Sequence, residues 1–398
     1  MERLKTAVAQ IAATTDSRLR ELPLLHRSLL LPLLSLASSL YRHSLALRRR
    51  VYALGLLSRQ RLPVPVISVG NLTWGGNGKT PMVEFIARIF LEAGISPLIL
   101  TRGYAGGDEV KMIQRHLAGT PTRIGVGANR SATAASIFRQ HGYMKFNSTL
   151  FAEQLSSTQH LRLASGNDKV AVAILDDGMQ HWSLSRDVEM VMINGLIPWG
   201  NNHLLPRGSL REPLDALCRA DITVIHHADL LSEGKLKMIE TKIRIIDPCS
   251  TIFFSRLAPS HFFEVKNQHS ILPLGLVLNR TVLCVSGIGS PCAFAQVVGK
   301  IGPSYVDRLD FDDHHSIQFH DIKLIKERLE ELANRFREKI IVVVTEKDYD
   351  RDPLILTELH DFDVLVLCCS LHIMTTKGQS EESFKIKLKE LLISKHGG

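Results

Sequence analysis

The chain has 398 residues, of which 45% are hydrophobic and 22% charged, a composition typical of a folded globular protein and not of a disordered one. Its 48 Lys and Arg exceed its 40 Asp and Glu by eight, and all of that excess lies in residues 1–61, where eleven basic side chains meet three acidic ones. The rest is neutral, which excludes a basic body that coats nucleic acid and indicates a partner for the N-terminal segment alone.

A chain of this length buries an ample core and usually forms two domains. Its six cysteines form no CxxC pair and show no metal-ligand spacing with histidine. This pattern favours a reduced compartment and gives no sign of a structural zinc site.

The N-terminal segment combines leucines with arginines. Its longest uncharged apolar stretch, residues 28–41, contains Pro32 and is too short to span a bilayer. Arginines on both sides of a leucine pattern favour an amphipathic helix in the headgroup plane of an anionic membrane; the leucines are Leu22, Leu24, Leu25, Leu29, Leu30, Leu33, Leu34 and Leu36. The alternative is a helix packed on its own domain with its arginines in solvent. Residues 1–21 have the composition of a targeting stretch, against which Glu2 and Asp16 count.

A phosphate-binding loop follows next. The β-branched run at 64–70 predicts a strand, the glycine-rich segment 71–80 (NLTWGGNGKT) a loop, and the amphipathic stretch after Thr80 a helix. Glycines let backbone N–H groups approach phosphate oxygens, Lys79 reaches the β- and γ-phosphates, and the Thr80 hydroxyl can bind Mg²⁺. The strict pattern is not met, because its first glycine falls on Thr73, so a turn that binds nothing is the alternative.

A second chemical signal is the run VAVAILDDG at 170–178. It predicts a buried parallel strand that ends in Asp176 and Asp177, of which one would hold Mg²⁺ directly or through water. An ordinary Asp-Gly turn would explain the pair in isolation, but not together with Lys79 and Thr80. Further strands are predicted at 96–103, 188–195 and 221–228, which gives an α/β fold built on a parallel sheet.

Other polar clusters follow the predicted strands. Asp108 follows the strand at 96–103 and is a candidate base at the sheet edge that carries the phosphate loop. Arg130 and Arg211 add cations, although a surface ion pair explains an isolated arginine equally well. His314 and His315 lie in a polar DDHH segment of the second half of the chain.

Eight segments occur in order along the chain: GNLTWGGNGKTP, TRGYAGGDE, VGANR, DDGMQHWSLSRD, LLPRGSLREP, SGIGSP, FDDHH and VTEKD. Together they resemble the tetraacyldisaccharide 4'-kinase family of the lipid A pathway, from about Leu47 to Asp348, and the family shares the missing first glycine. The resemblance implies transfer of the ATP γ-phosphate to the 4'-hydroxyl of a tetraacylated disaccharide 1-phosphate at a membrane surface, giving a 1,4'-bisphosphorylated lipid IVA-type product. It also implies a P-loop NTPase-like domain, a smaller second α/β domain and a two-stranded linker.

The resemblance also assigns residues. Asp108 matches the catalytic base, paired with a histidine assigned to His314 with His315 as the fallback, while Lys79 and Arg211 match cations near the phosphates. Tyr104 and Arg130 fall on other motif positions. The implied ATP-binding residues are Gly75, Gly76, Asn77, Gly78, Lys79, Thr80, Gln180 and His181, and the implied Mg²⁺ ligands are Thr80, Asp176 and Asp177. A carboxylate is a weak base near neutral pH, so the histidine would orient and tune it.

The expected organisation is an N-terminal membrane-docking segment (1–61), a nucleotide domain (62–247), a linker hairpin (248–280) and a second domain (281–398). Nucleotide and lipid sugar should bind between the domains, so that closure completes the base pair. No nucleic acid and no obligate protein partner are expected.

The segment 143–169 looks inserted relative to bacterial members, and the chain begins earlier than theirs. These differences suggest a eukaryotic, plant member, peripheral to the mitochondrial inner membrane on its matrix side. For a bacterial chain the place would be the cytoplasmic face of the inner membrane.

Two other classes of function remain. A membrane-associated P-loop switch ATPase would hydrolyse ATP without a lipid substrate. A phosphoesterase built on the two histidines would need further Asp motifs and would not need Lys79.

Overall fold

The computed structural model describes residues 2–14, 16–103, 107–147, 153, 169–376 and 378–396. Tyr104 and most of the segment expected to be inserted at 143–169 therefore lie outside the described residues. The chain begins with four helical segments, which are α1 (Glu2–Ala13), the 3₁₀ turn η1 (Asp16–Glu21), the π-helical turn η2 (His26–Leu30) and α2 (Leu31–Ala53).

Strands and helices then alternate in the order that a parallel sheet requires. The strands in the centre of the sheet are buried along their whole length, because helices cover both faces, and this explains their unbroken apolar runs. The elements are β1 (Val66–Asn71), α3 (Lys79–Glu92), β2 (Pro97–Thr101), α4 (Asp108–His116), β3 (Arg123–Val126), α5 (Arg130–His141), β4 (Val172–Asp176), β5 (Val188–Asn194), η4 (Leu214–Arg219), β6 (Ile222–His226), η5 (Ala228–Leu230) and α7 (Glu233–Ile246).

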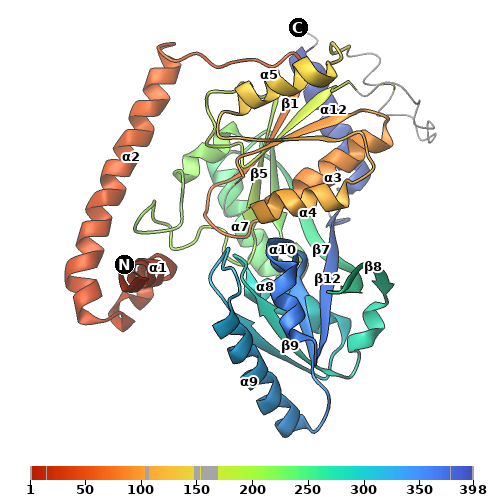
Figure 1. Cartoon of the computed structure of the whole chain (residues 1–398). Helices are drawn as coiled ribbons and strands as arrows, with labels where there is room; N and C mark the ends of the chain where they lie inside the picture. The colour runs from red at the N-terminus through yellow and green to blue at the C-terminus, as the bar shows by residue number, and fades with distance from the viewer. Residues whose placement is uncertain are drawn as a thin grey trace.

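A long strand leads into the second part of the molecule, which repeats the alternation on a smaller scale (Figure 1). Its elements are β7 (Thr251–Glu264), β8 (Asn267–Leu272), η6 (Leu274–Val277), β9 (Thr281–Ser286), α8 (Pro291–Ile301), β10 (Tyr305–Asp310), α9 (Phe319–Phe336), β11 (Ile341–Thr345), α10 (Glu346–Arg351), α11 (Pro353–Leu356), η7 (Thr357–Leu359), β12 (Asp363–Ile373) and α12 (Glu381–His396).

All described strands belong to one sheet in the order β10-β9-β11-β12-β7-β6-β5-β1-β4-β2-β3, with β8 paired to β7. We call β3-β2-β4-β1-β5-β6 the first half-sheet and β10-β9-β11-β12 the second half-sheet. Strands are parallel within each half-sheet, whereas β12 is antiparallel to β7. The predicted α/β fold with a mostly parallel sheet is confirmed.

The antiparallel pair β7–β12 joins the halves, so the linker differs from the hairpin expected at 248–280. The strands β7 and β8 do form a hairpin, but β8 does not reach the first half-sheet. Instead β6 pairs with residues 251–255 of β7, and β12 pairs with β7 from Ser255 to Glu264 before continuing beside β11. The sequence could not show this, because the partner strand lies about a hundred residues further along the chain.

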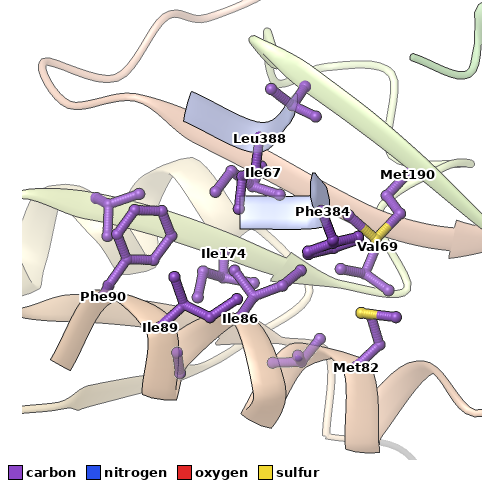
Figure 2. Close-up of a cluster of buried hydrophobic side chains, with 14 of the residues drawn as sticks. Ile67, Val69, Met82, Ile86, Ile89, Phe90, Ile174, Met190, Phe384 and Leu388 are labelled. Carbon is purple, nitrogen blue, oxygen red and sulfur yellow. The ribbon is translucent and has the colours of Figure 1, made fainter. Parts of the chain in front are cut away.

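The last helix also departs from the expected second domain at 281–398. After β12 the chain returns to the first half-sheet, where α12 inserts Phe384, Leu388 and Leu392 into the core around β1 and α3 (Figure 2). The Phe384 ring centroid lies 5.1 Å from that of Phe253 and 5.6 Å from that of Phe85. The first half-sheet is therefore closed by the C-terminal helix.

The helix α2 packs on the first half through one face and leaves its other face exposed. Ser38 Oγ donates to Leu204 O at 2.8 Å, the Tyr41 hydroxyl donates to Arg211 O at 2.8 Å, and Arg49 pairs with Asp215 at 2.9 Å. The exposed leucines include Leu33, Leu36, Leu40 and Leu47. Among the described residues, no helix combines the length and the apolar character needed to cross a bilayer.

Ion pairs join the halves a second time, along α4 of the first and α10 of the second. Arg115 donates to Asp350 at 2.7 Å and to Glu346 at 3.0 Å. His116 lies between Glu84 of α3 and Glu346, with both nitrogen–oxygen distances at 2.6 Å. Burial opposes the charged ring, but the hydrogen bonds to Glu346 and Glu84 prevail and raise the pKa of His116 to about 9.

Replacing Phe384 by Ala should destabilise the protein by about 3–5 kcal/mol, because it opens a cavity between α12 and the sheet. Denaturant unfolding of the full chain measures this effect. Ile386 lies on the same helix but is half exposed, so Ile386→Ala should cost about 0.5 kcal/mol or less. Equal losses in the two variants would contradict the packing of α12.

The charged His116 should make stability depend on pH. A folded-state pKa above the usual 6.5 means that the protonated ring stabilises the fold fully below pH 6.5, and this contribution is lost as pH rises through about 9. Over that range the wild type should lose on the order of 2 kcal/mol more than His116→Gln. Chemical unfolding at a series of pH values measures it, and parallel curves for the two proteins would contradict it.

Candidate active site

The glycine-rich loop connects β1 to α3, as the sequence predicts. Gly78 is the N-cap of α3 with φ 77°, and a Cβ atom there would lie 2.5 Å from the His226 ring, so the position accepts glycine alone. Thr73 stands where the strict pattern has its first glycine, and its hydroxyl donates to Asn77 Oδ1 at 3.0 Å. The Asn77 amide in turn donates to Gly75 O and Thr73 O. A side-chain network therefore shapes the loop in place of that glycine.

The second half-sheet contacts this loop directly. Gly76 O accepts hydrogen bonds from Asn194 Nδ2 at 2.8 Å and from Ser290 Oγ at 3.1 Å. Gly289 lies so close that a Cβ atom on it would be 2.2 Å from Gly76 N. The segment 286–290 (SGIGS) after β9 thus covers the phosphate loop from across the cleft.

Asp176 and Asp177 end β4 beside the loop, but their surroundings differ. Both Asp177 oxygens accept from the Arg211 guanidinium at 2.7 Å, and Lys79 Nζ lies 3.5 Å from Asp177 Oδ1. Although burial alone would raise it, Lys79 and Arg211 hold the pKa of Asp177 well below its usual range. Arg130, the first residue of α5, donates to the backbone carbonyl of Asp176 at 2.7 Å.

Asp176 has the properties of a cation ligand. Its side chain is buried, and Oδ1 has no hydrogen-bond partner among the described residues. Burial, followed by the nearby Glu109 carboxylate, raises the pKa of Asp176 to about 7. A buried carboxylate oxygen without a partner among the described residues and the Thr80 hydroxyl line the same cleft, and such oxygen ligands fit Mg²⁺. Asp177 is also predicted as a metal ligand; both of its oxygens accept from Arg211, which makes Asp176 the better candidate.

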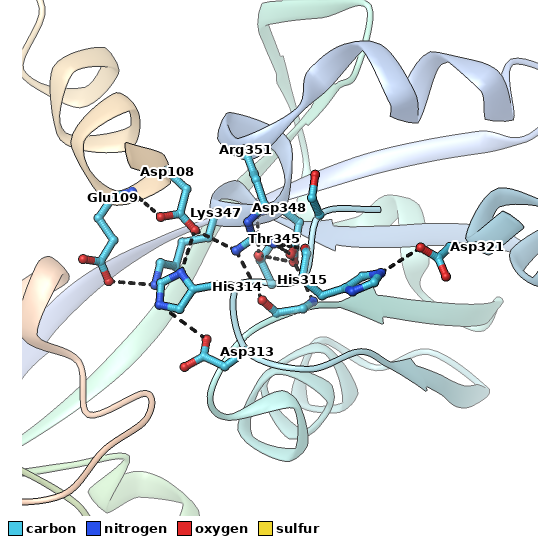
Figure 3. Close-up of polar contacts among 12 residues, drawn as sticks. Asp108, Glu109, Asp313, His314, His315, Asp321, Thr345, Lys347, Asp348 and Arg351 are labelled. Carbon is cyan, nitrogen blue, oxygen red and sulfur yellow. Dashed lines mark hydrogen bonds and ion pairs between the residues drawn. The ribbon is translucent and has the colours of Figure 1, made fainter. Parts of the chain in front are cut away.

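Asp108 meets His314 across the two halves (Figure 3). Asp108 is the first residue of α4 and is completely buried, and its Oδ2 lies 3.3 Å from His314 Nδ1. Burial opposes the Asp108 charge, but His314, Lys347 and Arg351 together hold the pKa of Asp108 well below its usual range. The hydrogen bond to Asp108 raises the pKa of His314.

The neighbouring histidine points elsewhere. His315 Nε2 lies 2.7 Å from Asp321 Oδ2, at the start of α9. His314 has φ 62°, a conformation uncommon for residues other than glycine, and its N–H donates to Gly287 O at 3.1 Å. The loop therefore directs His314, and not the fallback His315, toward Asp108.

A cleft of about 400 Å³ between the halves brings most of the predicted residues together. It is lined by Gly75, Gly76, Asn77, Gly78, Lys79, Thr80, Asp176, Asp177, Arg211 and His314. Asp108 lies directly behind His314 and does not itself line the cleft among the described residues. The side of the pair that faces the cleft is therefore the His314 ring.

Gln180 and His181 lie outside this cleft as the structure describes it, which differs from their expected place at the nucleotide. The Gln180 amide donates to Asn71 O at 3.0 Å and so supports the end of β1. Burial, together with surrounding arginines, lowers the pKa of His181 to about 4.

Several site residues were missed by the sequence reasoning. Asn194 and Ser290 hold the phosphate loop, Lys347 pairs with Glu109 at 2.8 Å, and Arg351 contacts Asp108 at 2.7 Å. Lys347 lies in the VTEKD segment, which the resemblance included without assigning a role. Arg351 lies three residues after this segment, and no motif or pattern in the sequence indicated a role for it.

The chain matches known proteins in sequence and in fold. The family model of tetraacyldisaccharide-1-P 4'-kinase matches residues 30–389. A relative from Arabidopsis thaliana, named "Probable tetraacyldisaccharide 4'-kinase, mitochondrial", is 50% identical over 99% of both chains. A tetraacyldisaccharide 4'-kinase from Halothermothrix orenii is 31% identical over 84% of this chain and 87% of its own.

Among solved structures, the "apo" form of LpxK from Aquifex aeolicus in complex with ATP matches with a TM-score of 0.57 at 22% identity. The match covers 92% of this chain and all of that one, and it shows that the two proteins share a fold. The family match and the identity to the Arabidopsis relative go further: the chain belongs to the tetraacyldisaccharide-1-P 4'-kinase family.

Proposed function

We propose that the protein transfers the γ-phosphate of ATP to the 4'-hydroxyl of a tetraacyldisaccharide 1-phosphate, giving a 1,4'-bisphosphorylated lipid of the lipid IVA type. The observation that carries this proposal is a single cleft with the phosphate loop on one wall and His314 on the other, where the His314 ring meets Asp108 of the first half. A kinase needs this arrangement, because the acceptor hydroxyl must meet a proton acceptor in line with the γ-phosphate. Membership of the family supplies the lipid acceptor.

The phosphate loop binds the triphosphate in this proposal. Backbone N–H groups of residues 75–80 and the N-terminus of α3 face the β- and γ-phosphates, and Lys79 adds its charge. Thr80 and Asp176 would hold Mg²⁺, which neutralises charge on the phosphates. Arg211 is fixed by its two bonds to Asp177, so Asp177 acts by holding a cation at the γ-phosphate.

The Asp108–His314 pair takes the proton of the acceptor. As the 4'-oxygen attacks the γ-phosphorus, the bond to the ADP oxygen breaks and the hydroxyl proton passes to the pair. Asp108 is buried behind the ring, so its negative charge provides the basicity and His314 connects it to the cleft. Neither group would be as effective alone, because a carboxylate with a depressed pKa is a weak base.

The helix α2 brings the cleft to a membrane surface. Leu33, Leu36, Leu40 and Leu47 repeat at helical spacing and are each more than half exposed. On its other side, α2 contacts the backbone at Arg211 and Gln180, through the Tyr41 hydroxyl and Arg48 respectively. A helix that lies in the headgroup layer would therefore place the cleft beside the sugar of a lipid substrate.

The proposed location is the matrix side of the mitochondrial inner membrane. The support for it is the name of the Arabidopsis relative, which matches over 99% of this chain, together with the basic N-terminal segment. A negatively charged membrane surface attracts such a segment.

Incubation with γ-labelled ATP and a tetraacyldisaccharide 1-phosphate in detergent should move the label into the lipid. His314→Ala should lower this transfer by about 10²–10⁴-fold and Lys79→Ala should abolish it, both without unfolding the protein. His315→Ala is the matched control, because its ring points to Asp321, and it should retain most of the activity. Hydrolysis of ATP with no label in the lipid would reject the lipid kinase and favour a switch ATPase.

Changing Leu33, Leu36, Leu40 and Leu47 together to Gln should abolish binding to anionic vesicles, because the apolar face of α2 is lost. Flotation of the full-length protein with vesicles that contain about one fifth anionic phospholipid measures it. Wild-type binding should also weaken as salt is added. The control changes Leu276 and Leu278, two exposed leucines remote from α2, to Gln. Unchanged flotation of the α2 variant would exclude this helix as the docking surface.

A further inference from the structure

The Arg351 guanidinium lies where the two halves meet at the base. Its Nη2 donates to Asp108 Oδ2 at 2.7 Å, and its Nη1 donates to His315 O at 2.7 Å (Figure 3). Nη2 also lies 3.3 Å from Gly287 O, the same carbonyl that accepts the His314 N–H. One side chain from α10 therefore contacts Asp108 and both backbone segments that hold His314.

The guanidinium is itself held rigidly. Its side chain is 7% exposed, and Asp348, one turn earlier on α10, accepts from Nη1 at 2.8 Å. Asp348 also accepts the Gly287 N–H at 3.0 Å and the Thr345 hydroxyl at 2.6 Å. A guanidinium that bonds to this many fixed acceptors sets the orientation of the groups around it and also supplies a positive charge. A lysine ammonium would supply only the charge.

The bonds to Asp108 use both of its oxygens. Oδ1 accepts the Glu109 N–H at 2.9 Å, and Oδ2 accepts from Arg351 and faces His314 Nδ1. The carboxylate therefore presents Oδ2 to the ring in one orientation. Around it lie three further basic and acidic groups: Lys347 and Glu109, which pair with each other, and Asp313, 3.9 Å from His314 Nε2.

We propose that Arg351 is the positioning residue of the Asp108–His314 pair, a role that rests on the proposed kinase function. It acts through Asp108, whose oxygen it aims at the ring, and through the carbonyl of His315, which sets the position of the histidine loop. Because Arg351 comes from the second half and Asp108 from the first, the base is correctly arranged only when the halves are together. Arg351 also helps to keep Asp108 ionised below neutral pH.

An ion pair that only held α4 and α10 together would show the same distances as the contact between Arg351 and Asp108. Arg115 makes a contact of that kind and serves as the comparison. It lies on α4, makes three hydrogen bonds to Glu346 and Asp350 of α10, and touches neither Asp108 nor the histidine loop. Removing Arg115 weakens the contact between the halves and leaves the base untouched. Arg351→Met and Arg115→Met therefore separate positioning from closure.

The test measures kcat and KM for lipid transfer as a function of pH in the wild type, Arg351→Met, Arg351→Lys and Arg115→Met. In Arg351→Met we expect kcat to fall about 30–100-fold with little change in KM for ATP, because the reacting geometry is lost. The acid limb of the kcat profile should move up by about 1–2 pH units, because the Asp108–His314 pair loses a neighbouring positive charge and therefore holds its proton more tightly. Arg351→Lys should restore the acid limb, but kcat should stay about 10-fold low, because one ammonium cannot reach both acceptors.

Arg115→Met should leave the acid limb where it is in the wild type, even if KM rises. An unmoved acid limb in Arg351→Met, or equal effects of Arg351→Met and Arg115→Met, would overturn the proposal. If Arg351→Met does not fold, as thermal unfolding would reveal, the lysine variant decides alone, and a wild-type kcat in it overturns the proposal. Absence of lipid transfer in the wild type would instead reject the proposed function, so the two failures are distinguishable.

Discussion

The antiparallel pairing of β7 with β12 is the constraint on which the site depends. β6 pairs with residues 251–255 of β7 and runs in the same direction, whereas the second half-sheet follows β12 and runs the opposite way. The carboxyl ends of both half-sheets therefore point at each other across the short stretch of β7 after Ser255. Parallel sheets bind ligands at these ends, so one pairing gives a cleft with functional loops on both walls. The loops after β1, β2 and β4 form one wall, and those after β9, β10 and β11 form the other.

Paired charges, of which Asp108 and Arg351 are buried and the others partly buried, make this cleft sensitive to the separation of its walls. Within the first wall, Asp177 is neutralised by Arg211 and Lys79. Across the walls, Asp108 is neutralised by Arg351 and Glu109 by Lys347. Removing one partner from a buried ion pair leaves an uncompensated charge, which is far more costly than the pair is stabilising. Separation of the halves exposes both cross-wall pairs to water at once, so closure and the arrangement of the base are linked by the same contacts.

Local patterns in the sequence predicted individual strands, loops and helices, but few of the contacts between residues that lie far apart along the chain. The strand, loop and helix around Lys79, and the two carboxylates after β4, follow from short motifs, because hydrophobic runs and glycines fix those elements by themselves. The resemblance to a known family added the pairing of Asp108 with His314, residues 206 positions apart. It did not supply Arg351, which meets Asp108 across 243 positions from a short helix without a distinctive pattern. The return of α12 to the first half-sheet was hidden likewise, because this helix has little amphipathic periodicity and no local pattern shows which sheet a helix covers.

The N-terminal helix shows why the two alternatives for residues 22–50 need not exclude each other. One face of α2 is fixed to the first half by Ser38, Tyr41 and Arg49, as the packed alternative expected. The opposite face leaves leucines in solvent at a spacing that only a helix aligns, and no described element covers it. A helix anchored in this way has a fixed orientation relative to the cleft. The Tyr41 hydroxyl donates to the backbone carbonyl of Arg211, and the Arg211 side chain reaches Asp177 in the cleft. A surface bound by the leucines would hence lie at a fixed angle to the phosphate loop, so that an acceptor fixed in a membrane can approach an ATP fixed in the protein.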